Sequence, residues 1–247
     1  YSGERLPQCV GCIRYAVSCL QARAGCSAES GASVKNQVMR RLAWNALVHI
    51  RRPWRLIVIC LLGIAVISIY PSDLDVYRET PPSTHPIVVG VEDYGRYINT
   101  AVQIGLPFVM RDPVGILQNL YIAVGSTMLT HGIKRALDPV LVAGTQLGER
   151  PNGGRHNMPS GHSSMASSAM YFVGRRYGWW HLIYMLPILL MTMFARVALD
   201  AHTISAVLAG ALAGIVGAAL FTSSFPPQVN IEFVKNEILR IGRASSR

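Results

Sequence analysis

A run of small polar residues, NMPSGHSSMA at 157–166, interrupts a very apolar chain. Pro159, Ser160, Gly161 and His162 follow one another there, and a helix rich in small residues is predicted to start at this point. The N-terminus of a helix favours anions through its free N–H groups and its dipole, and glycine lets the backbone approach a ligand closely. The run therefore predicts a turn that can cradle a phosphate at a membrane surface.

Cations and a second histidine stand in three neighbouring stretches. Lys134 follows an apolar segment, Arg150 opens the run that leads to His162, and ARVALDAH holds Arg196 and His202. Arginine binds phosphate oxygens in a bidentate fork, and lysine binds them as a point charge. Of two histidines, one can attack phosphorus and form a phosphohistidine while the other protonates the leaving oxygen. These residue types therefore indicate cleavage of a phosphate ester, with the cations stabilising charge on the phosphoryl oxygens.

Each of these residues also has a purely structural interpretation. His162 could be an ordinary residue at a helix N-terminus, and His202 an interfacial histidine. Lys134 and Arg196 could be cations at the ends of spans that extend into the interface. The pattern taken together favours the catalytic interpretation.

The composition indicates a protein of the lipid bilayer. Hydrophobic residues make up 51% of the 247 residues and charged residues only 15%, whereas a soluble domain has about 25% charged residues. The net charge is +10, but the Lys and Arg residues cluster between apolar segments instead of forming one stripe. This arrangement is typical of membrane topology signals, so we expect the bilayer and not nucleic acid as the partner.

Six apolar segments come close to the roughly 20 residues that a membrane-spanning helix needs. We therefore expect an all-α, polytopic membrane protein with a six-helix bundle at 54–222. It is preceded by a cytoplasmic segment, 1–53, with a basic amphipathic helix, and followed by a cytoplasmic tail, 223–247. The fourth and sixth segments are rich in Ser, Ala and Gly, which predicts interior helices because small residues allow close helix packing in lipid. The six segments are 54–70, 97–110, 114–133, 162–174, 179–195 and 203–221.

The distribution of charge predicts which face carries the site. Six spans put both termini on one side, and most Lys and Arg outside the spans fall on that side, which should be cytoplasmic. The opposite, periplasmic face of a bacterial inner membrane then receives the acidic loop 71–96 and the remaining cations beside the two histidines. Those cations are Lys134, Arg135, Arg150, Arg155 and Arg196.

The five cysteines give little support to a metal centre. The pair in CVGC at 9–12 would need a second ligand pair at suitable spacing to hold zinc. Cys19 and Cys26 are loosely placed and no histidine lies near them. We expect reduced thiols in a cytoplasmic segment, and no metal site.

The motifs resemble those of the type 2 phosphatidic acid phosphatase superfamily, whose pattern is a Lys followed by Arg-Pro, then Pro-Ser-Gly-His, then Ser-Arg followed by His and Asp. This chain has the three parts in order over residues 114–221. The resemblance implies a six-helix membrane core and metal-free action on a lipid phosphate or pyrophosphate. It implies His202 as the nucleophile, His162 as the general acid and five phosphate-binding residues: Lys134, Arg150, Ser160, Gly161 and Arg196. The run RPNGG…PSGHSS is most similar to bacterial members that act on lipid A and on undecaprenyl pyrophosphate.

Three positions depart from the family pattern. Lys134 precedes Arg150 by sixteen residues, a longer gap than usual, which the insertion PVLVAGTQLG could explain. Ala195 stands where Ser is usual. Ala206 stands four residues after His202, where the family has an Asp that would hold the histidine tautomer. Either the protein was altered at Ala206 or another group orients His202; Asp200 is the nearest carboxylate, but its two-residue offset suits a helix poorly.

We therefore expect an enzyme that hydrolyses a phosphomonoester or pyrophosphate on a membrane lipid, of the lipid A, undecaprenyl pyrophosphate or phosphatidylglycerophosphate class, without a cofactor. Two alternatives remain open at this stage. A lipid acceptor could replace water, which would make the protein a phosphotransferase. The alanine at 206 is also consistent with a non-catalytic transporter or anion-binding protein. The sequence does not identify the lipid or an oligomeric state, and His156 is a possible accessory group.

Overall fold

A computed structural model describes residues 50–79 and 81–225, together with residues 36, 40, 43, 44 and 46–48. The CVGC motif, most of the expected N-terminal amphipathic helix and the tail after residue 225 lie outside the described residues. The chain divides into two compact units, and the unit described here spans Asn45–Asn230.

Helices form at all six apolar segments, which confirms the helical fold class for the described residues. Four short helices lie between the long ones: α3 (Asp75–Arg78), α4 (Pro86–Asp93), η1 (Gly95–Tyr97) and η2 (Trp179–His181). The six long helices are α2 (Trp54–Ile69), α5 (Ile98–Val109), α6 (Pro113–Leu137), α7 (Gly161–Tyr177), α8 (Leu182–Ala198) and α9 (Ile204–Phe221).

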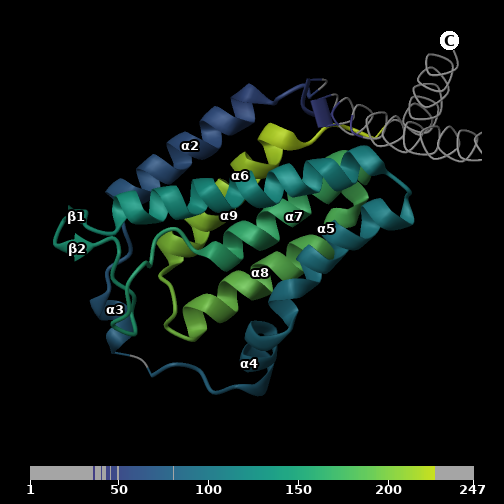
Figure 1. The fold of residues 1–247 in the computed structure, drawn as a ribbon. Coiled ribbons are helices and arrows are strands. Elements are labelled where there is room, and N and C mark those ends of the chain that lie inside the picture. The colour runs from purple at the N-terminus through teal and green to yellow at the C-terminus, as the bar shows by residue number, and fades with distance from the viewer. Residues whose placement is uncertain are drawn as a thin grey trace, which may run out of the picture. The chain divides into compact units, whose positions relative to one another are not determined.

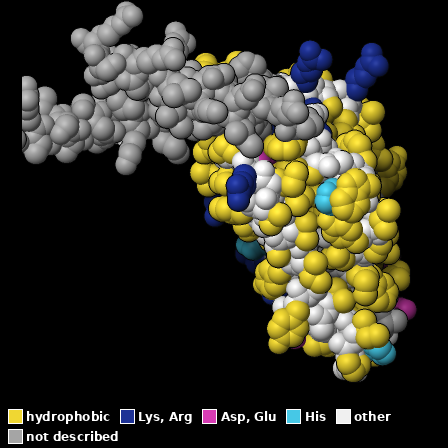
Figure 2. Space-filling view, turned by 90° about the vertical axis from the view of Figure 1, so that its right-hand side faces the viewer, with side chains coloured by type: hydrophobic (Ala, Val, Ile, Leu, Met, Phe, Trp, Pro, Cys, Tyr) yellow, Lys and Arg dark blue, Asp and Glu magenta, His cyan; other side chains and the backbone are white. Residues whose placement is uncertain are grey.

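Two helical stretches of the described chain are long and apolar enough to cross a membrane. They are Trp179–Ala198 and Ile204–Phe221, and the apolar helix Trp54–Ile69 is shorter. Figure 2 shows one face of the unit covered largely by hydrophobic side chains. The helices and their apolar surface agree with a membrane protein, while the number of six spans stays a prediction.

The two helices rich in small residues occupy the centre of the bundle (Figure 1). α9 packs on α7, α2 and α6, and α7 also packs on α8 and α5. A Cβ atom added at Gly214 would lie 2.1 Å from the carbonyl oxygen of Ser164, and one at Gly217 would lie 2.1 Å from Oγ of Ser126. Glycine therefore lets the α9 backbone approach both neighbours. The prediction that these two helices are interior is confirmed by their burial.

A proline inside α5 explains a contact between α5 and α6. Pro107 has no N–H group, so the carbonyl of Gln103, four residues earlier, loses its helical donor. Asn119 of α6 replaces that donor, with Nδ2 2.5 Å from the Gln103 oxygen. The side-chain amide thus satisfies the backbone group and joins the two helices.

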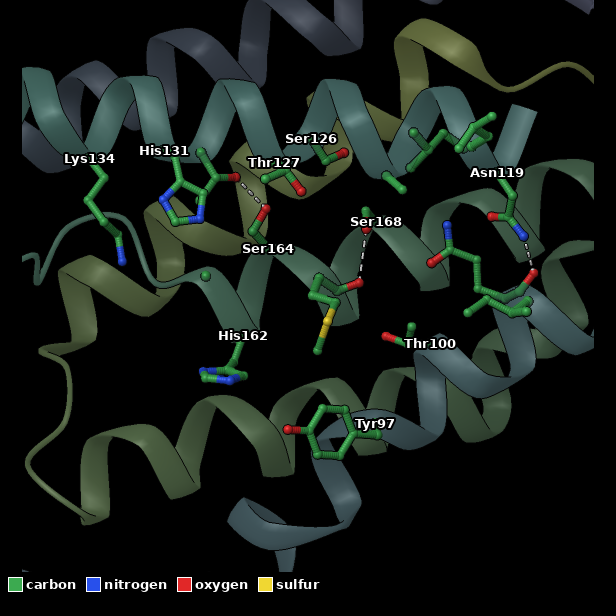
Figure 3. A pocket seen from close by; sticks show the side chains of 18 of the residues that line it. Tyr97, Thr100, Asn119, Ser126, Thr127, His131, Lys134, His162, Ser164 and Ser168 are labelled. Atoms are coloured by element: carbon green, nitrogen blue, oxygen red, sulfur yellow. Dashed lines mark hydrogen bonds between the residues drawn. The ribbon is translucent and has the colours of Figure 1, made fainter. Parts of the chain in front are cut away.

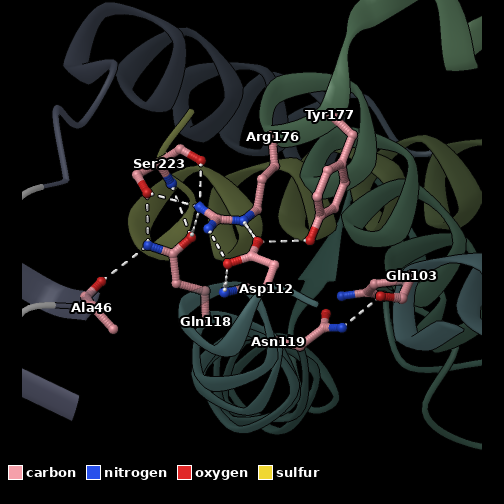
Figure 4. A network of polar contacts seen from close by, with 9 residues as sticks. Ala46, Gln103, Asp112, Gln118, Asn119, Arg176, Tyr177 and Ser223 are labelled. Carbon is pink, nitrogen blue, oxygen red and sulfur yellow. Dashed lines mark hydrogen bonds and ion pairs between the residues drawn. The ribbon is translucent and has the colours of Figure 1, made fainter. Parts of the chain in front are cut away.

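A buried ion pair joins the turn before α6, the C-terminal end of α7 and the segment after α9 (Figure 4). Arg176 donates from Nη2 to Oδ1 of Asp112 at 2.7 Å and from Nη1 to Oε1 of Gln118 at 3.1 Å. It also donates to the carbonyl of Ser223 at 3.0 Å, while the Tyr177 hydroxyl donates to Asp112 at 2.8 Å. Arg176 follows the predicted span 162–174 and is one of the Lys and Arg residues outside the spans that indicated the cytoplasmic side, but its side chain is fully buried and closes one end of the bundle.

Candidate active site

The predicted site residues lie at the other end of these helices, around one cavity of about 730 Å³ between α5, α6 and α7. They come from the end of α6, the loop after it, the start of α7, the end of α8 and the turn before α9. Figure 3 shows Lys134, His131 and His162 toward one end of the cavity and Asn119 toward the other. The predicted residues that line the cavity are Lys134, Arg150, Gly161, His162, Arg196 and His202.

The long gap between Lys134 and Arg150 does not separate them, because the intervening residues fold back on themselves. Strands β1 (Leu141–Val142) and β2 (Thr145–Gln146) pair antiparallel across a two-residue turn. Both turn residues have positive φ, 48° at Ala143 and 83° at Gly144, as a type I′ hairpin requires. Lys134 therefore lines the same cavity as Arg150, and its side chain is buried.

The turn before α7 is fixed by α9. The N–H of Ser160 donates to the carbonyl of Ala206 at 2.8 Å, and a Cβ at Gly210 would lie 2.3 Å from the Ser160 carbonyl oxygen. Beside Gly161, in contrast, an added Cβ would meet no atom within 4 Å, so the space next to this glycine belongs to the cavity. Ser160 itself is fully buried, its Oγ accepts a bond from Ser163, and it does not line the cavity.

Asn157 occupies the orienting position that the sequence left unassigned. Its Oδ1 lies 3.3 Å from Nδ1 of His202 and accepts a bond from the Thr203 N–H at 3.2 Å. A backbone N–H can only donate, so the Asn157 atom that faces it is the oxygen, and that oxygen can only accept from His202. Nδ1 of His202 therefore carries the proton and Nε2 keeps its lone pair. The short run of polar residues around 157 gave no signal that this amide reaches a residue 45 positions away.

His202 is held in its neutral form. Its side chain is buried, and burial together with the charges of Arg196, Arg150 and Lys134 lowers its pKa from 6.5 to about 2. Burial disfavours a charged imidazole, and neighbouring cations disfavour it further. A neutral imidazole with a free nitrogen is the form that can attack an electrophile.

A carboxylate from helix α4 joins two of the cations. Glu92 in α4 accepts hydrogen bonds from Arg96 and from Arg196 through the same oxygen. Arg96 also donates from Nη1 to Nε2 of His162 at 3.2 Å. The sequence placed Glu92 and Arg96 only among the charges of an outer loop, so neither was predicted to reach the site.

Three other positions that the sequence pointed to do not line the cavity. Ala206 is fully buried at the start of α9, where its N–H donates to Thr203 Oγ1 at 3.3 Å. Asp200 accepts a bond from the Asn152 N–H through its backbone carbonyl. His156 turns to Asp138, with Nδ1 3.1 Å from Oδ1, and does not line the cavity.

The cations of the site keep donors available for an anion. In the part of the chain that the structure describes, Lys134 and Arg150 form no ion pair, and the Nε groups of Arg150 and Arg196 are buried without a partner. No three His, Cys, Asp or Glu side chains of the described residues are grouped as a metal ion would require. Metal-free catalysis stays a prediction from the motifs.

Comparison with known proteins identifies the family of the chain. The sequence profile of the PAP2 superfamily matches residues 118–229. A Helicobacter pylori protein named lipid A 1-phosphatase is 41% identical over 166 residues, which cover 67% of this chain and 86% of that protein. The chain belongs to the PAP2 superfamily.

Other relatives of this PAP2 protein carry related names. A lipid A 1-phosphatase from a second Helicobacter pylori strain is 47% identical over 132 residues, which cover 53% of this chain and 69% of that protein. A lipid A 4'-phosphatase from the same strain is 36% identical over 126 residues, covering 48% and 62% of the two chains. No solved structure gives a significant match to the chain.

Proposed function

We propose that this PAP2 protein is a membrane lipid phosphatase that transfers the phosphoryl group of its substrate to His202 and then to water. One observation carries the proposal. A neutral imidazole with a free nitrogen and a second imidazole, on His162, both line a cavity that also holds Lys134 and Arg150, which form no ion pair within the described part of the chain. Membership of the superfamily and the names of the relatives support a lipid phosphate as the substrate.

The phosphoryl group would bind between the cations and the first turn of α7. Lys134, Arg150 and Arg196 provide the positive charge, and the open space beside Gly161 lets phosphate oxygens approach the free N–H groups of the helix. Ser160 would contribute through the position of its backbone, which α9 fixes, because its hydroxyl is turned to Ser163.

In the first step, Nε2 of His202 attacks phosphorus. The new P–N bond forms as the bond between phosphorus and the ester oxygen breaks, and protonated His162 gives its proton to the departing oxygen. Asn157 accepts from Nδ1 throughout, so the imidazole stays oriented while it becomes positively charged. The cations stabilise the charge on the equatorial oxygens.

In the second step, water attacks the phosphohistidine. His162, now neutral, accepts a proton from that water as the P–N bond breaks, and the bonding pair returns to Nε2 of His202. The products are inorganic phosphate and the lipid alcohol, or the lipid monophosphate when the substrate is a pyrophosphate. Both histidines then return to their starting protonation states.

The rest of the cavity suits an acyl or prenyl chain. Away from the cations it is lined by apolar side chains of α5 and α6, including Ile104, Phe108 and Leu120. Leu120 precedes Lys134 by fourteen residues, which corresponds to about 21 Å along α6 at 1.5 Å per residue. A lipid tail could therefore lie along α6 while its phosphate is held by the cations.

The membrane orientation is part of this proposal. We place the protein in a bacterial inner membrane, with both termini in the cytoplasm and the phosphate site on the periplasmic face. The excess of Lys and Arg outside the predicted spans on the opposite side supports this orientation. The names of the relatives favour the phosphate of lipid A over that of undecaprenyl pyrophosphate or phosphatidylglycerophosphate.

Phosphate release from a panel of purified lipids tests the proposal. The full chain in detergent is given lipid A, undecaprenyl pyrophosphate, phosphatidylglycerophosphate or phosphatidic acid. We expect phosphate release from lipid A, a fall of at least ~10³-fold in His202→Ala and His162→Ala, and little change in His181→Gln at the other end of the bundle. Transfer of phosphate to a second lipid without free phosphate would show a phosphotransferase, and no turnover of any lipid would leave an anion-binding protein.

A further inference from the structure

We infer that Arg96 is a head-group-binding residue of this site, held in place by Glu92, and that it selects lipids in which an oxygen adjoins the carbon carrying the phosphate ester. The inference rests on the proposed function, because it assigns the substrate part that Arg96 would contact. Neither residue belongs to the motifs that resemble the superfamily, since both lie in the loop between the first two predicted spans.

Glu92 fixes two guanidinium groups at once. One carboxylate oxygen accepts from Arg96 and Arg196, while the other oxygen is buried without a partner among the described residues. The side chain of Glu92 is 18% exposed and that of Arg196 only 9%. A carboxylate beside a phosphate site opposes binding of the substrate charge, so its presence is explained by the orientation it gives to the two arginines.

Tyr97 also holds the guanidinium group of Arg96. Its Nη2 donates to the Tyr97 hydroxyl at 2.8 Å, and its guanidinium carbon lies 4.7 Å from the centre of the Tyr97 ring. Tyr97 itself lines the cavity (Figure 3). Tyr97 and His162 line the cavity, whereas Arg96 does not. Its guanidinium lies against both residues, with Nη1 directed at His162.

The contact between Arg96 and His162 cannot persist during catalysis. Arginine can only donate, so Nε2 of His162 must be an acceptor while this bond is present. A protonated imidazole donates from both nitrogens, so His162 cannot be the charged general acid and accept from Arg96 at the same time. Arg96 must therefore exchange its bond to His162 for another acceptor when the substrate binds.

The substrate supplies that acceptor on the side of the leaving group. His162 would protonate the ester oxygen, so an arginine that borders His162 lies next to the atoms attached to that oxygen. In a sugar 1-phosphate the ester carbon also bears the ring oxygen, which can accept from Arg96. In phosphatidic acid the corresponding carbon is a plain methylene group, so Arg96 has no acceptor there.

The experiment compares two lipids and one phosphate mimic. Phosphate release is measured for a glucosamine 1-phosphate lipid and for phosphatidic acid, and inhibition by vanadate reports the phosphoryl pocket. The variants are Arg96→Gln, Arg96→Lys and Glu92→Gln. The matched control is Arg78→Gln, which removes an arginine of the same loop that pairs with Glu149 outside the cavity.

We expect Arg96→Gln to lower kcat/KM for the sugar lipid about 10–100-fold, the worth of one charged hydrogen bond. For phosphatidic acid the loss stays below about threefold and vanadate inhibition changes less than about twofold, because the phosphoryl pocket is intact. Arg96→Lys recovers part of the loss, Arg78→Gln behaves as the unaltered chain, and Glu92→Gln lowers turnover of both lipids because it also releases Arg196.

Equal losses on both lipids, or a matching loss of vanadate inhibition, would show that Arg96 acts on the phosphoryl group and overturn the assignment. An unchanged kcat/KM in Arg96→Gln would overturn it as well. If the unaltered chain releases phosphate from neither lipid, the proposed function fails and the assignment of Arg96 fails with it. If the unaltered chain releases phosphate and Arg96→Gln leaves kcat/KM unchanged, only the head-group role of Arg96 is rejected, and the proposed function is not.

Discussion

Replacing Asn157 tests whether its neutral amide orients His202, the role that the family pattern gives to an Asp at position 206. Its side chain makes three hydrogen bonds of 3.2–3.3 Å, one to His202 and two to Thr203. Asn157→Ala leaves the Thr203 N–H and the His202 Nδ1–H buried without an acceptor, and each orphaned group costs about 1–3 kcal/mol. For the two groups together we therefore expect a loss of about 2–6 kcal/mol in the free energy of unfolding.

The effect on turnover follows from the same contact. Without the acceptor, His202 populates both tautomers and rotates more freely, so we expect kcat/KM to fall about 10–100-fold, less than the wrong-tautomer penalty of about 10⁴ in a serine protease triad. Asn157→Asp keeps an acceptor for His202, and the Thr203 hydroxyl can turn to donate to it, so we expect most activity to remain.

Phosphate release and thermal unfolding of the same preparations separate the two effects. Asn152→Ala is the matched control, because this asparagine caps the neighbouring Gly154 N–H in the same loop at 3.1 Å and does not contact His202. An Asn157→Ala protein that is folded at the assay temperature and keeps full kcat/KM would refute the orienting role.

Three further outcomes follow from the packing and charge of the site. Ala206→Asp alone is not expected to raise kcat/KM, because Asn157 already engages Nδ1 of His202; a marked gain in phosphate release would show that the chain lacks its orienter. Gly210→Ala is expected to lower the melting temperature and kcat/KM together, since its Cβ would lie 2.3 Å from the Ser160 carbonyl oxygen; unchanged values of both would contradict that close approach. The free energy of unfolding should fall as the pH drops below 6.5, by up to roughly 1.4 kcal/mol per pH unit. The reason is that His202 becomes protonated in the unfolded chain but stays neutral when it is buried in the folded protein. Melting temperatures between pH 8 and pH 5 would show a smaller slope in His202→Asn, and an identical slope would contradict the buried neutral state.

The helices and the motif residues could be predicted because their signals are local. Apolar segments of sufficient length gave six helices at the expected places, and the small residues of α7 and α9 indicated interior packing. The order of the motifs between those helices was enough to expect Lys134, His162 and His202 near one another. The structure places all three on one cavity, while their catalytic roles stay predictions.

The residues that the sequence did not reveal act through contacts between distant segments. Asn157 reaches His202 across 45 positions, and Glu92 reaches Arg196 across 104. A single polar residue carries no periodic signal, so neither contact follows from spacing. Arg176 shows the opposite case, since a charge at the end of a predicted span looked like a topology signal but is buried against Asp112.

Rapid chemical quench during turnover of a lipid labelled with ³²P in its phosphate is the most direct measurement of the central claim. The account expects an acid-labile phosphoryl group on the peptide that contains His202, formed before free phosphate appears. Both the label and the turnover should disappear in His202→Ala. Turnover with no label on that peptide, or turnover that persists in His202→Ala, would contradict the assignment of His202 as the nucleophile.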